Sequence, residues 1–302
     1  MIKCKLILTF ILLTSIFTFG QSKIKGIILD SLSKKPIPYV HILAKEGKAT
    51  ISDEKGHFLT AKNHNTLTFS AIGYESKEIK LSSSPITVFL NPEIYLLPDI
   101  KVLPEKTSII EIGNVEKIRW NQIKASLGSF GNGSKVVKFI PPEQLMEGAI
   151  KTISFYVADK AKFNQLIRLL LYLPDSISQK PSTNLLPKSI ITSLGKKKKW
   201  HEIDITNLHI PVPSNGFYVG LEFLPVFGDY PFQDKLHIGL IGNENKQFTW
   251  TKMMDDEWNT ADFLKTANRE IANLMVKVKI ESPLSEIKKI DASASKIKLL
   301  SY

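Results

Sequence analysis

The chain has 302 residues, of which 43% are hydrophobic and 23% are charged, so it can bury sizeable cores and is not a disordered polymer. At about 150 residues per domain, this length predicts two domains. The formal net charge of +11 suits contact with anionic surfaces, and it also keeps a protein soluble without any such partner.

Residues 1–20 have the pattern of a secretory signal peptide. Lys3 and Lys5 precede an apolar run over residues 6–19, and small residues at its end predict cleavage before Gln21. The run is shorter than the about 20 residues that span a bilayer. We therefore expect an exported chain with no transmembrane segment after cleavage; a retained membrane anchor is the alternative.

The single cysteine, Cys4, precedes the apolar run, whereas the lipid-bearing cysteine of a lipoprotein follows such a run. After the predicted cleavage the chain would contain no cysteine. This excludes disulfides, a thiolate nucleophile and cysteine-ligated zinc from the mature protein, which would depend on its hydrophobic cores for stability.

Residues 21–91 are predicted to form a first β-sandwich. Short apolar runs alternate with turn segments rich in Gly, Pro, Asn and Ser, a pattern typical of an antiparallel sandwich. The predicted strands are Ile24–Leu29, Tyr39–Ala44, Lys48–Ser52, His57–Ala61, Thr66–Ile72, Ser76–Leu81 and Ile86–Leu90.

The segment SDEKGHF, within the first sandwich, could begin a calcium loop or could be a turn. A calcium loop needs carboxylates at alternate positions over about twelve residues and a distal glutamate. Asp53 and Glu54 are instead adjacent, and Lys55 would repel a cation. Because Asp53 can cap a tight turn and Gly56 can adopt a positive φ, we predict a turn without a metal.

Three features of this region carry a family resemblance. They are Gly26 with Asp30 in GIILDSLSKKPIPYVHI, the segment Ser52–Phe58, and LTFSAIGYESKEIKL followed by ITVFLNP. The chain from Lys23 to about Val102 thus resembles the carboxypeptidase regulatory-like domain. This resemblance implies a transthyretin-like fold and a protein of the Gram-negative envelope, where such domains also head TonB-dependent receptors.

Two positions depart from the family pattern. Tyr39-Val40 stands where small residues usually follow the proline, and Leu97-Pro98-Asp99 replaces the acidic lead-in to a receptor plug. The remaining chain is too short for a large outer-membrane barrel, so the resemblance does not imply a transporter. It implies no peptidase activity either, since the H-x-x-E pair of the zinc carboxypeptidases is missing.

Residues 107–281 are predicted to form a second β-sandwich. Many short apolar runs joined by long polar loops suggest a jelly-roll-like fold, and residues 200–224 resemble galactose-binding-like sandwiches. The predicted strands are Ile109–Gly113, Ser134–Ile140, Ile150–Ala158, Leu166–Leu173, Lys188–Leu194, Trp200–Ile205, Gly216–Leu224, Lys235–Gly242, Gln247–Met253 and Asn273–Ile280.

Two segments flank this second sandwich. Pro92, Pro98 and Pro104 interrupt the chain before it, so residues 92–106 are predicted to be a linker. Residues 282–302 are expected to be a flexible tail, as chain ends without an apolar pattern commonly are.

Motifs for catalysis are incomplete. In Gly128–Lys135 (GSFGNGSK), Ser134 precedes the lysine, whereas a phosphate loop places Ser or Thr after it, so we expect a glycine-rich turn. His201-Glu202 lacks the second histidine of H-E-x-x-H, and no G-x-S-x-G elbow marks a nucleophile. We therefore expect no catalytic, cofactor-binding or metal-binding residues; a triad assembled across the chain stays an alternative.

Other polar residues have structural explanations. His41 and His237 lie in predicted strands and are expected to be packed or edge residues. Asp255, Asp256 and Glu257 are consecutive, so their side chains point in different directions and are expected to form a solvated turn rather than a glycosidase pair.

Two features could bind a ligand. Lys196–Lys199 in GKKKKW are expected to form an exposed loop, which could contact phosphates or anionic glycans or serve solubility alone. Trp200 and Trp250 lie in predicted strands and are expected in the core. Trp258 is expected at the surface, where aromatic rings can stack on sugars.

These patterns predict an all-β, non-catalytic, exported protein of the cell envelope that acts as a structural or partner-binding module. It would lie in the periplasm, at the outer membrane or on the cell surface. Its partner would be an envelope protein or a glycan rather than nucleic acid, with peripheral contact to anionic envelope surfaces. The alternatives are a carbohydrate-binding or adhesive protein and, less favoured, a hydrolase.

Overall fold

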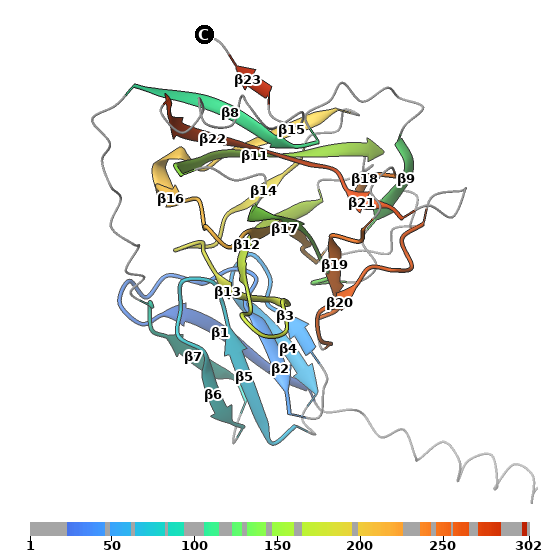
Figure 1. Ribbon diagram of the computed structural model, residues 1–302. Helices are drawn as coiled ribbons and strands as arrows, with labels where there is room; N and C mark the ends of the chain where they lie inside the picture. The colour runs from blue at the N-terminus through green and yellow to red at the C-terminus, as the bar shows by residue number, and fades with distance from the viewer. Residues whose placement is uncertain are drawn as a thin grey trace, which may run out of the picture.

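The computed structural model describes residues 23–45, 49–61, 64–81, 84–93, 106–114, 123–128, 132–142, 147–159, 165–194, 199–225, 236–242, 246–254, 256–265, 271–284 and 298–300. The predicted signal peptide and most of the predicted linker lie outside these ranges. The described chain forms two β-sandwiches, which confirms the all-β prediction (Figure 1). In the described ranges no helix has the length and apolar character needed to cross a membrane.

The first sandwich consists of a three-stranded and a four-stranded sheet. The seven predicted strands are all present; His57–Ala61 and Ile86–Leu90 have the predicted bounds, and the other five have shifted ends. The three-stranded sheet has the order β4 (His57–Ala61), β1 (Lys23–Asp30) and β7 (Ile86–Leu90), and the four-stranded sheet has the order β3 (Ala49–Ile51), β2 (His41–Ala44), β5 (Thr66–Ser70) and β6 (Lys77–Lys80).

One pairing in the first sandwich differs from the purely antiparallel prediction. Strand β7 pairs with β1 in parallel, because the chain enters β7 from β6 of the opposite sheet and not through a hairpin with β1. Alternate residues of both sheets meet in a core that includes Ile28, Val40, Ile42, Phe58, Leu67, Phe69, Val88 and Leu90.

The turn predicted at Asp53 is confirmed. Its Oδ1 accepts hydrogen bonds from the N–H groups of Lys55 and His57, both at 2.8 Å, and Gly56 has a φ of 73°. The turn joins β3 to β4, which belong to different sheets, so it carries the chain across the sandwich instead of closing a hairpin.

The second sandwich consists of a seven-stranded and a nine-stranded sheet, both antiparallel. The seven-stranded sheet has the order β13 (Pro181–Asn184), β12 (Leu166–Pro174), β17 (Phe217–Phe223), β10 (Lys135–Ile140), β19 (Thr249–Lys252) and β20 (Asn259–Thr260), with β14 (Ile191–Ser193) also on β12.

The nine-stranded sheet covers the other side of the main core (Figure 1). It has the order β21 (Asn273–Leu274), β18 (His237–Ile241), β11 (Ala149–Asp159), β22 (Val276–Pro283), β8 (Thr107–Gly113) and β23 (Lys298–Leu300), with β15 (Trp200–Asp204) and β16 (Ile210–Pro211) on β11 and β9 (Ile123–Gly128) on β18. The 3-10 helix η4 (Thr206–Leu208) follows β15.

The end of the chain differs from the predicted flexible tail where it is described. Strand β22 continues to Pro283, and Lys298–Leu300 pairs with β8 as an added edge strand. Open edge strands offer unpaired backbone groups, which explains why a short apolar segment can join the sheet there.

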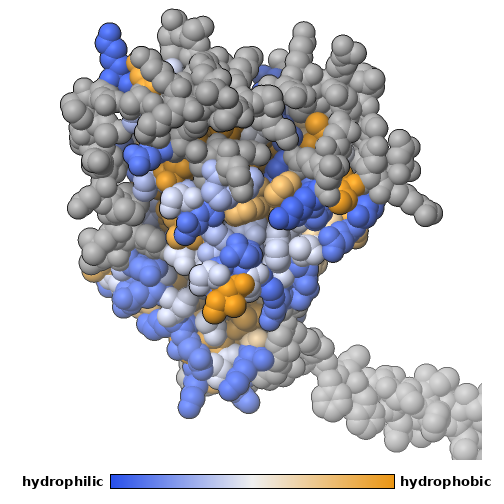
Figure 2. Space-filling view, viewed as in Figure 1, coloured by the Kyte–Doolittle hydropathy of each residue, from blue (hydrophilic) through white to orange (hydrophobic). Residues whose placement is uncertain are grey.

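Figure 2 shows one face of the molecule, on which hydrophobic side chains are scattered among hydrophilic ones.

Candidate functional site

The site lies on the outer face of the seven-stranded sheet, the face turned toward the first sandwich (Figure 1). Because side chains alternate along a strand, every second residue of β12, β17 and β10 points away from the core between the sheets. The registers place Arg168, Glu222 and Lys135 side by side in one row. The next row along the strands contains Leu170, Gly220, Val137 and Trp250. The row after it contains Tyr172, Tyr218 and Phe139.

Glu222 is the centre of a buried ion cluster. Arg168 Nη1 donates a hydrogen bond to its carboxylate at 2.9 Å, and His41 Nε2 of the first sandwich lies 2.6 Å from it. The side chains of Glu222 and Arg168 are only 1% and 3% exposed. Arg168 also donates to Ser189 Oγ at 2.9 Å and to the Tyr39 carbonyl at 2.5 Å. One arginine therefore connects both sandwiches.

The charges of this cluster set its protonation. Burial opposes the charge of Glu222, but its cationic neighbours, Arg168 foremost, outweigh burial and hold the pKa of Glu222 well below its usual range. Burial lowers the pKa of His41, and Lys135 and Arg168 oppose the pull of Glu222. A neutral His41 that donates from Nε2 to an ionised Glu222 fits the short distance between them.

The first sandwich reaches the cluster through the residues just before and at the start of β2. Tyr39 has a φ of 53°, an uncommon conformation for a residue other than glycine, and its carbonyl accepts the bond from Arg168. Val40 is buried in the first core, and His41 lies beside Ser70 of β5. Tyr39 and Val40 are the residues that depart from the family pattern; Tyr39 belongs to the contact between the sandwiches, and Val40 packs in the first core.

Two glycines allow close backbone approach at the same contact. A Cβ atom on Gly73 would lie 2.8 Å from the carbonyl of Pro187, and one on Gly133 would lie 2.7 Å from the side chain of Ile51. Both glycines have positive φ, at 84° and 73°. Ile72 packs against the apolar residues of the second sandwich. The contact therefore combines ionic, apolar and backbone packing.

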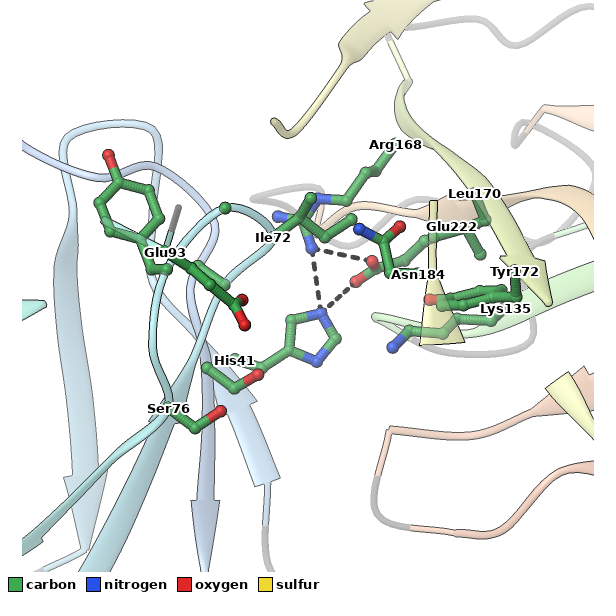
Figure 3. Close-up of a pocket in the computed structure, with 14 residues that line it drawn as sticks. His41, Ile72, Ser76, Glu93, Lys135, Arg168, Leu170, Tyr172, Asn184 and Glu222 are labelled. Carbon is green, nitrogen blue, oxygen red and sulfur yellow. Dashed lines mark hydrogen bonds and ion pairs between the residues drawn. The ribbon is translucent and has the colours of Figure 1, made fainter. Parts of the chain in front are cut away.

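A pocket of about 240 Å³ opens beside the ion cluster (Figure 3). This volume is below the about 300–1,000 Å³ of pockets for drug-sized ligands, so it suits a smaller molecule. Both sandwiches contribute walls: the first provides His41, Ser70, Ala71, Ile72, Gly73, Tyr74, Ser76 and Glu93, and the second provides Lys135, Arg168, Leu170, Tyr172, Asn184 and Glu222.

Lys135 supplies a cation to the pocket. Its side chain is half-buried, and Figure 3 shows it reaching into the space beside His41 and Tyr172. Burial lowers the pKa of Lys135, against the attraction of Glu222. Within the described part of the chain Lys135 forms no salt bridge, because the carboxylate of Glu222 is occupied by Arg168 and His41.

The predicted core positions of Trp200 and Trp250 are wrong, and Trp258 lies on an outer face as expected but is partly covered. Trp250 and Trp258 are half-buried on the outer face of the seven-stranded sheet, where Trp258 contacts the ring of Tyr172 edge-on at 5.9 Å. Trp200 is half-buried on the nine-stranded sheet, with the Lys277 ammonium 4.7 Å from its ring centroid. Neither Trp200 nor Trp250 belongs to the core between the sheets, because its strand position points outward.

Several predicted features lie away from the pocket. Residues 195–198 of the lysine segment are outside the described residues, and Lys199 is exposed. Asp256 and Glu257 are exposed in a turn, as predicted, and Glu257 pairs with Lys180 at 2.8 Å. In the predicted glycine-rich turn, residues 132–133 form a turn as predicted, and Gly128 ends strand β9.

Two other histidines have polar contacts away from the ion cluster. Ser126 Oγ lies 3.1 Å from His237 Nδ1 on the nine-stranded sheet, whereas Lys135, Arg168 and Glu222 lie on the seven-stranded sheet. His57 lies 3.4 Å from Asp53 in the exposed turn. Across the described ranges, no group of three or more His, Cys, Asp or Glu side chains could hold a metal ion.

Sequence reasoning missed the ion cluster. Arg168 and Glu222 each interrupt an apolar run, LIRLLLYL and GLEFL, and a lone charge in a buried strand signals a buried partner. His41 was expected to be a packed or edge residue, and the structure gives it a charged partner in the other sandwich.

A family model described as CarboxypepD_reg-like domain matches residues 24–100. This match confirms the resemblance of the N-terminal part, which contains the Tyr39–His41 side of the pocket. No curated protein sequence matches the chain.

One solved structure similar to this chain contains the cysteine protease and lectin-like domains of Cwp84, a surface layer associated protein of Clostridium difficile. The match has 8% sequence identity and a TM-score of 0.36, and it covers 50% of this chain and 32% of that chain. The chain thus spans about a third of that structure, and a likeness this low does not establish a common fold.

Proposed function

We propose that this protein is a non-catalytic, exported binding module of the cell envelope whose ligand site is the pocket between its two sandwiches. The observation that carries the proposal is the joint construction of the pocket. Residues of both sandwiches line it, and the buried contact of Arg168 and Glu222 with Tyr39 and His41 fixes the two walls. A pre-formed pocket needs little ordering when a ligand enters.

The contacts of His41 support binding over acid–base catalysis. A general base needs a free nitrogen within reach of the proton that it removes, and a nucleophile beside it. Glu222 occupies His41 Nε2, and the described residues place no hydroxyl in hydrogen-bond contact with His41, so its Nδ1 has no nucleophile beside it to activate. The side chain therefore acts as a connector between the sandwiches.

The sequence supports the location and partner in this proposal. The apolar run over residues 6–19 supports export to the periplasm, the outer membrane or the cell surface. The lysines at 196–199 support peripheral contact with anionic envelope surfaces, and the partner would be an envelope protein or a glycan.

A second candidate, a carbohydrate-binding or adhesive protein, is supported by one wall of the pocket. Tyr172 lines the pocket and is held by the edge of the Trp258 ring. An aromatic ring beside polar groups is a common surface for a small polar ligand.

The test is a screen of envelope-type glycans and small metabolites against the exported protein, repeated with Ser76→Trp. Ser76 is an exposed residue that lines the pocket, so a tryptophan there should fill the space and abolish binding. Ser193→Trp, at an exposed position in β14 outside the pocket, is the matched control. Binding that survives Ser76→Trp, or turnover of ester or glycoside substrates that His41→Gln removes, would contradict the proposal.

A further inference from the structure

The pocket has opposite polar character on its two sides. Lys135, on the second sandwich, presents an ammonium group, while Glu93, on the first, presents a carboxylate. Figure 3 shows Glu93 and Ser76 on the side of His41 away from Lys135 and Tyr172. The two charged groups are therefore separated by the pocket and do not form a salt bridge with each other.

The charge and three of the N–H groups of Arg168 are engaged in the contact between the sandwiches. Its Nε donates to Ser189, its Nη1 to Glu222 and its Nη2 to the Tyr39 carbonyl. These bonds hold one N–H of each guanidinium nitrogen in the contact, and the charge of Arg168 is paired with Glu222. Lys135 forms no salt bridge with another described residue, so it is the cation available to a ligand. Lys135 would repel a ligand whose cationic group entered from that side.

On the premise that the pocket is the binding site, as proposed above, we infer that it binds a small carboxylate with hydrogen-bond donors on its far side. The carboxylate would accept a charge-assisted hydrogen bond from Lys135. Hydroxyl or ammonium donors at the other end would face Glu93 and Ser76. The apolar side chains of Ile72 and Leu170 and the ring of Tyr172 would contact the carbon skeleton.

The volume limits this ligand class. About 240 Å³ holds a molecule smaller than a drug-sized ligand, so one sugar ring or one amino acid is the appropriate size. Sugar acids and amino acids share the same chemistry, a carboxylate opposite hydrogen-bond donors. A uronic acid offers hydroxyl groups to Glu93, and an amino acid offers an ammonium group.

Titration calorimetry with four probes tests the inference. D-glucuronate and L-alanine carry both the carboxylate and the donors, acetate lacks the donors, and D-glucose lacks the carboxylate. We expect glucuronate or alanine to bind at least about tenfold more tightly than acetate and glucose, because only these two satisfy both sides of the pocket. Whichever of the two binds more tightly identifies hydroxyl or ammonium donors as the preferred group.

Lys135→Met removes the cation while keeping a side chain of similar length. It should weaken binding of the better probe by about 10- to 100-fold, the effect of losing a hydrogen bond to a charged group. Lys135→Arg should retain most of the binding, which separates loss of charge from a folding defect. Lys252→Met, at the register partner of Lys135 on β19 and outside the pocket, should bind as the wild type does.

The outcomes separate this inference from the proposed function. If glucose binds as tightly as glucuronate, or if Lys135→Met binds normally while Ser76→Trp does not, the pocket is a binding site but the carboxylate inference is wrong. If none of the four probes binds, the inference is also overturned. If Ser76→Trp leaves ligand binding unchanged, the proposed site itself is wrong.

Discussion

A carboxylate that has left water stays ionised only where nearby charges and hydrogen bonds replace its hydration. Glu222 meets this condition through Arg168 in the same sheet, His41 from the other sandwich, and Lys135 in the neighbouring strand. Removing Glu222 leaves the cations of Arg168 and Lys135 without their anion, and removing Arg168 leaves Glu222 without its main cation. The residues of this cluster should therefore be sensitive to changes that an exposed ion pair would tolerate.

Glu222→Gln should destabilise the protein by about 3–5 kcal/mol, the usual cost of breaking a buried ion pair, because Arg168 then lacks an anion. Urea unfolding followed by fluorescence measures the change. Glu257→Gln is the matched control, since Glu257 pairs with Lys180 at the surface with its side chain 81% exposed, and its stability should match the wild type. Equal stability of the two variants would show that Glu222 is not buried in an ion cluster.

Stability should fall as the pH is lowered from about 7.5 to about 5.5. Burial lowers the pKa of His41 in the folded protein below its ordinary value of 6.5, so the unfolded chain takes up a proton at a pH where the folded protein does not. Proton uptake then favours unfolding. The contribution of a neutral His41 to the free energy of unfolding is fully present above pH 6.5 and is lost as the pH falls below 6.5. Glu222 adds a similar loss only at lower pH, below about 4.5.

His41→Gln isolates this effect. The variant should lose less stability between the two pH values than the wild type does, in urea unfolding at constant ionic strength. His57→Gln, at an exposed turn position, is the control and should keep the full pH dependence. A His41→Gln variant with the same pH dependence as the wild type would assign the effect to other groups.

Among the elements, the β3–β4 turn shows how local residues direct the chain between sheets. Asp53 holds two backbone N–H groups, and Gly56 adopts a φ of 73° close to the carbonyl of Ile28. A Cβ atom on Gly56 would lie 2.7 Å from that oxygen. The connection therefore depends on glycine for both its conformation and its packing.

Gly56→Ala should destabilise the protein by at least about 1–2 kcal/mol, the cost of the left-handed conformation for an L-residue, before any clash is added. Thermal and urea unfolding provide the measurement. Lys55→Ala changes an exposed residue of the same turn and should have little effect. A Gly56→Ala variant as stable as Lys55→Ala would mean that the turn has another conformation.

The strands were predictable where an apolar run had clear ends, as in all seven strands of the first sandwich. The short strands β13, β16 and β20 escaped prediction because they contain few apolar residues in alternation and depend on neighbouring strands for their pairing. Strands β9 and β23 also escaped prediction, and β21 was predicted as one strand with β22. The parallel pairing of β1 with β7 also escaped, since it is a property of the chain path and not of either segment.

The candidate site was less predictable than the fold. His41, Lys135, Arg168 and Glu222 lie in four different strands of the two sandwiches, so no local spacing connects them. Arg168 and Glu222 could have been recognised as charges inside apolar runs, but their partner His41 looks like any strand histidine. Its role depends on how the two sandwiches meet, which one sequence does not reveal.

At the scale of the whole molecule, the first sandwich completes a surface of the second. It covers the charged row of the seven-stranded sheet and provides one wall of the pocket, so the sandwiches should act as one unit in ligand binding. The glycines at 73 and 133 support this contact by allowing close approach at two further points. The account therefore depends on a direct interaction between His41 and Glu222 across the two sandwiches.

A double-mutant cycle of His41→Gln and Glu222→Gln, measured as free energies of unfolding in urea, tests this interaction most directly. Residues in direct contact show coupling energies of about 0.5–3 kcal/mol, whereas distant residues are additive within about 0.3–0.5 kcal/mol. We predict coupling well above the additive limit. Additive effects of the two substitutions would contradict the contact between the sandwiches and, with it, the shared pocket.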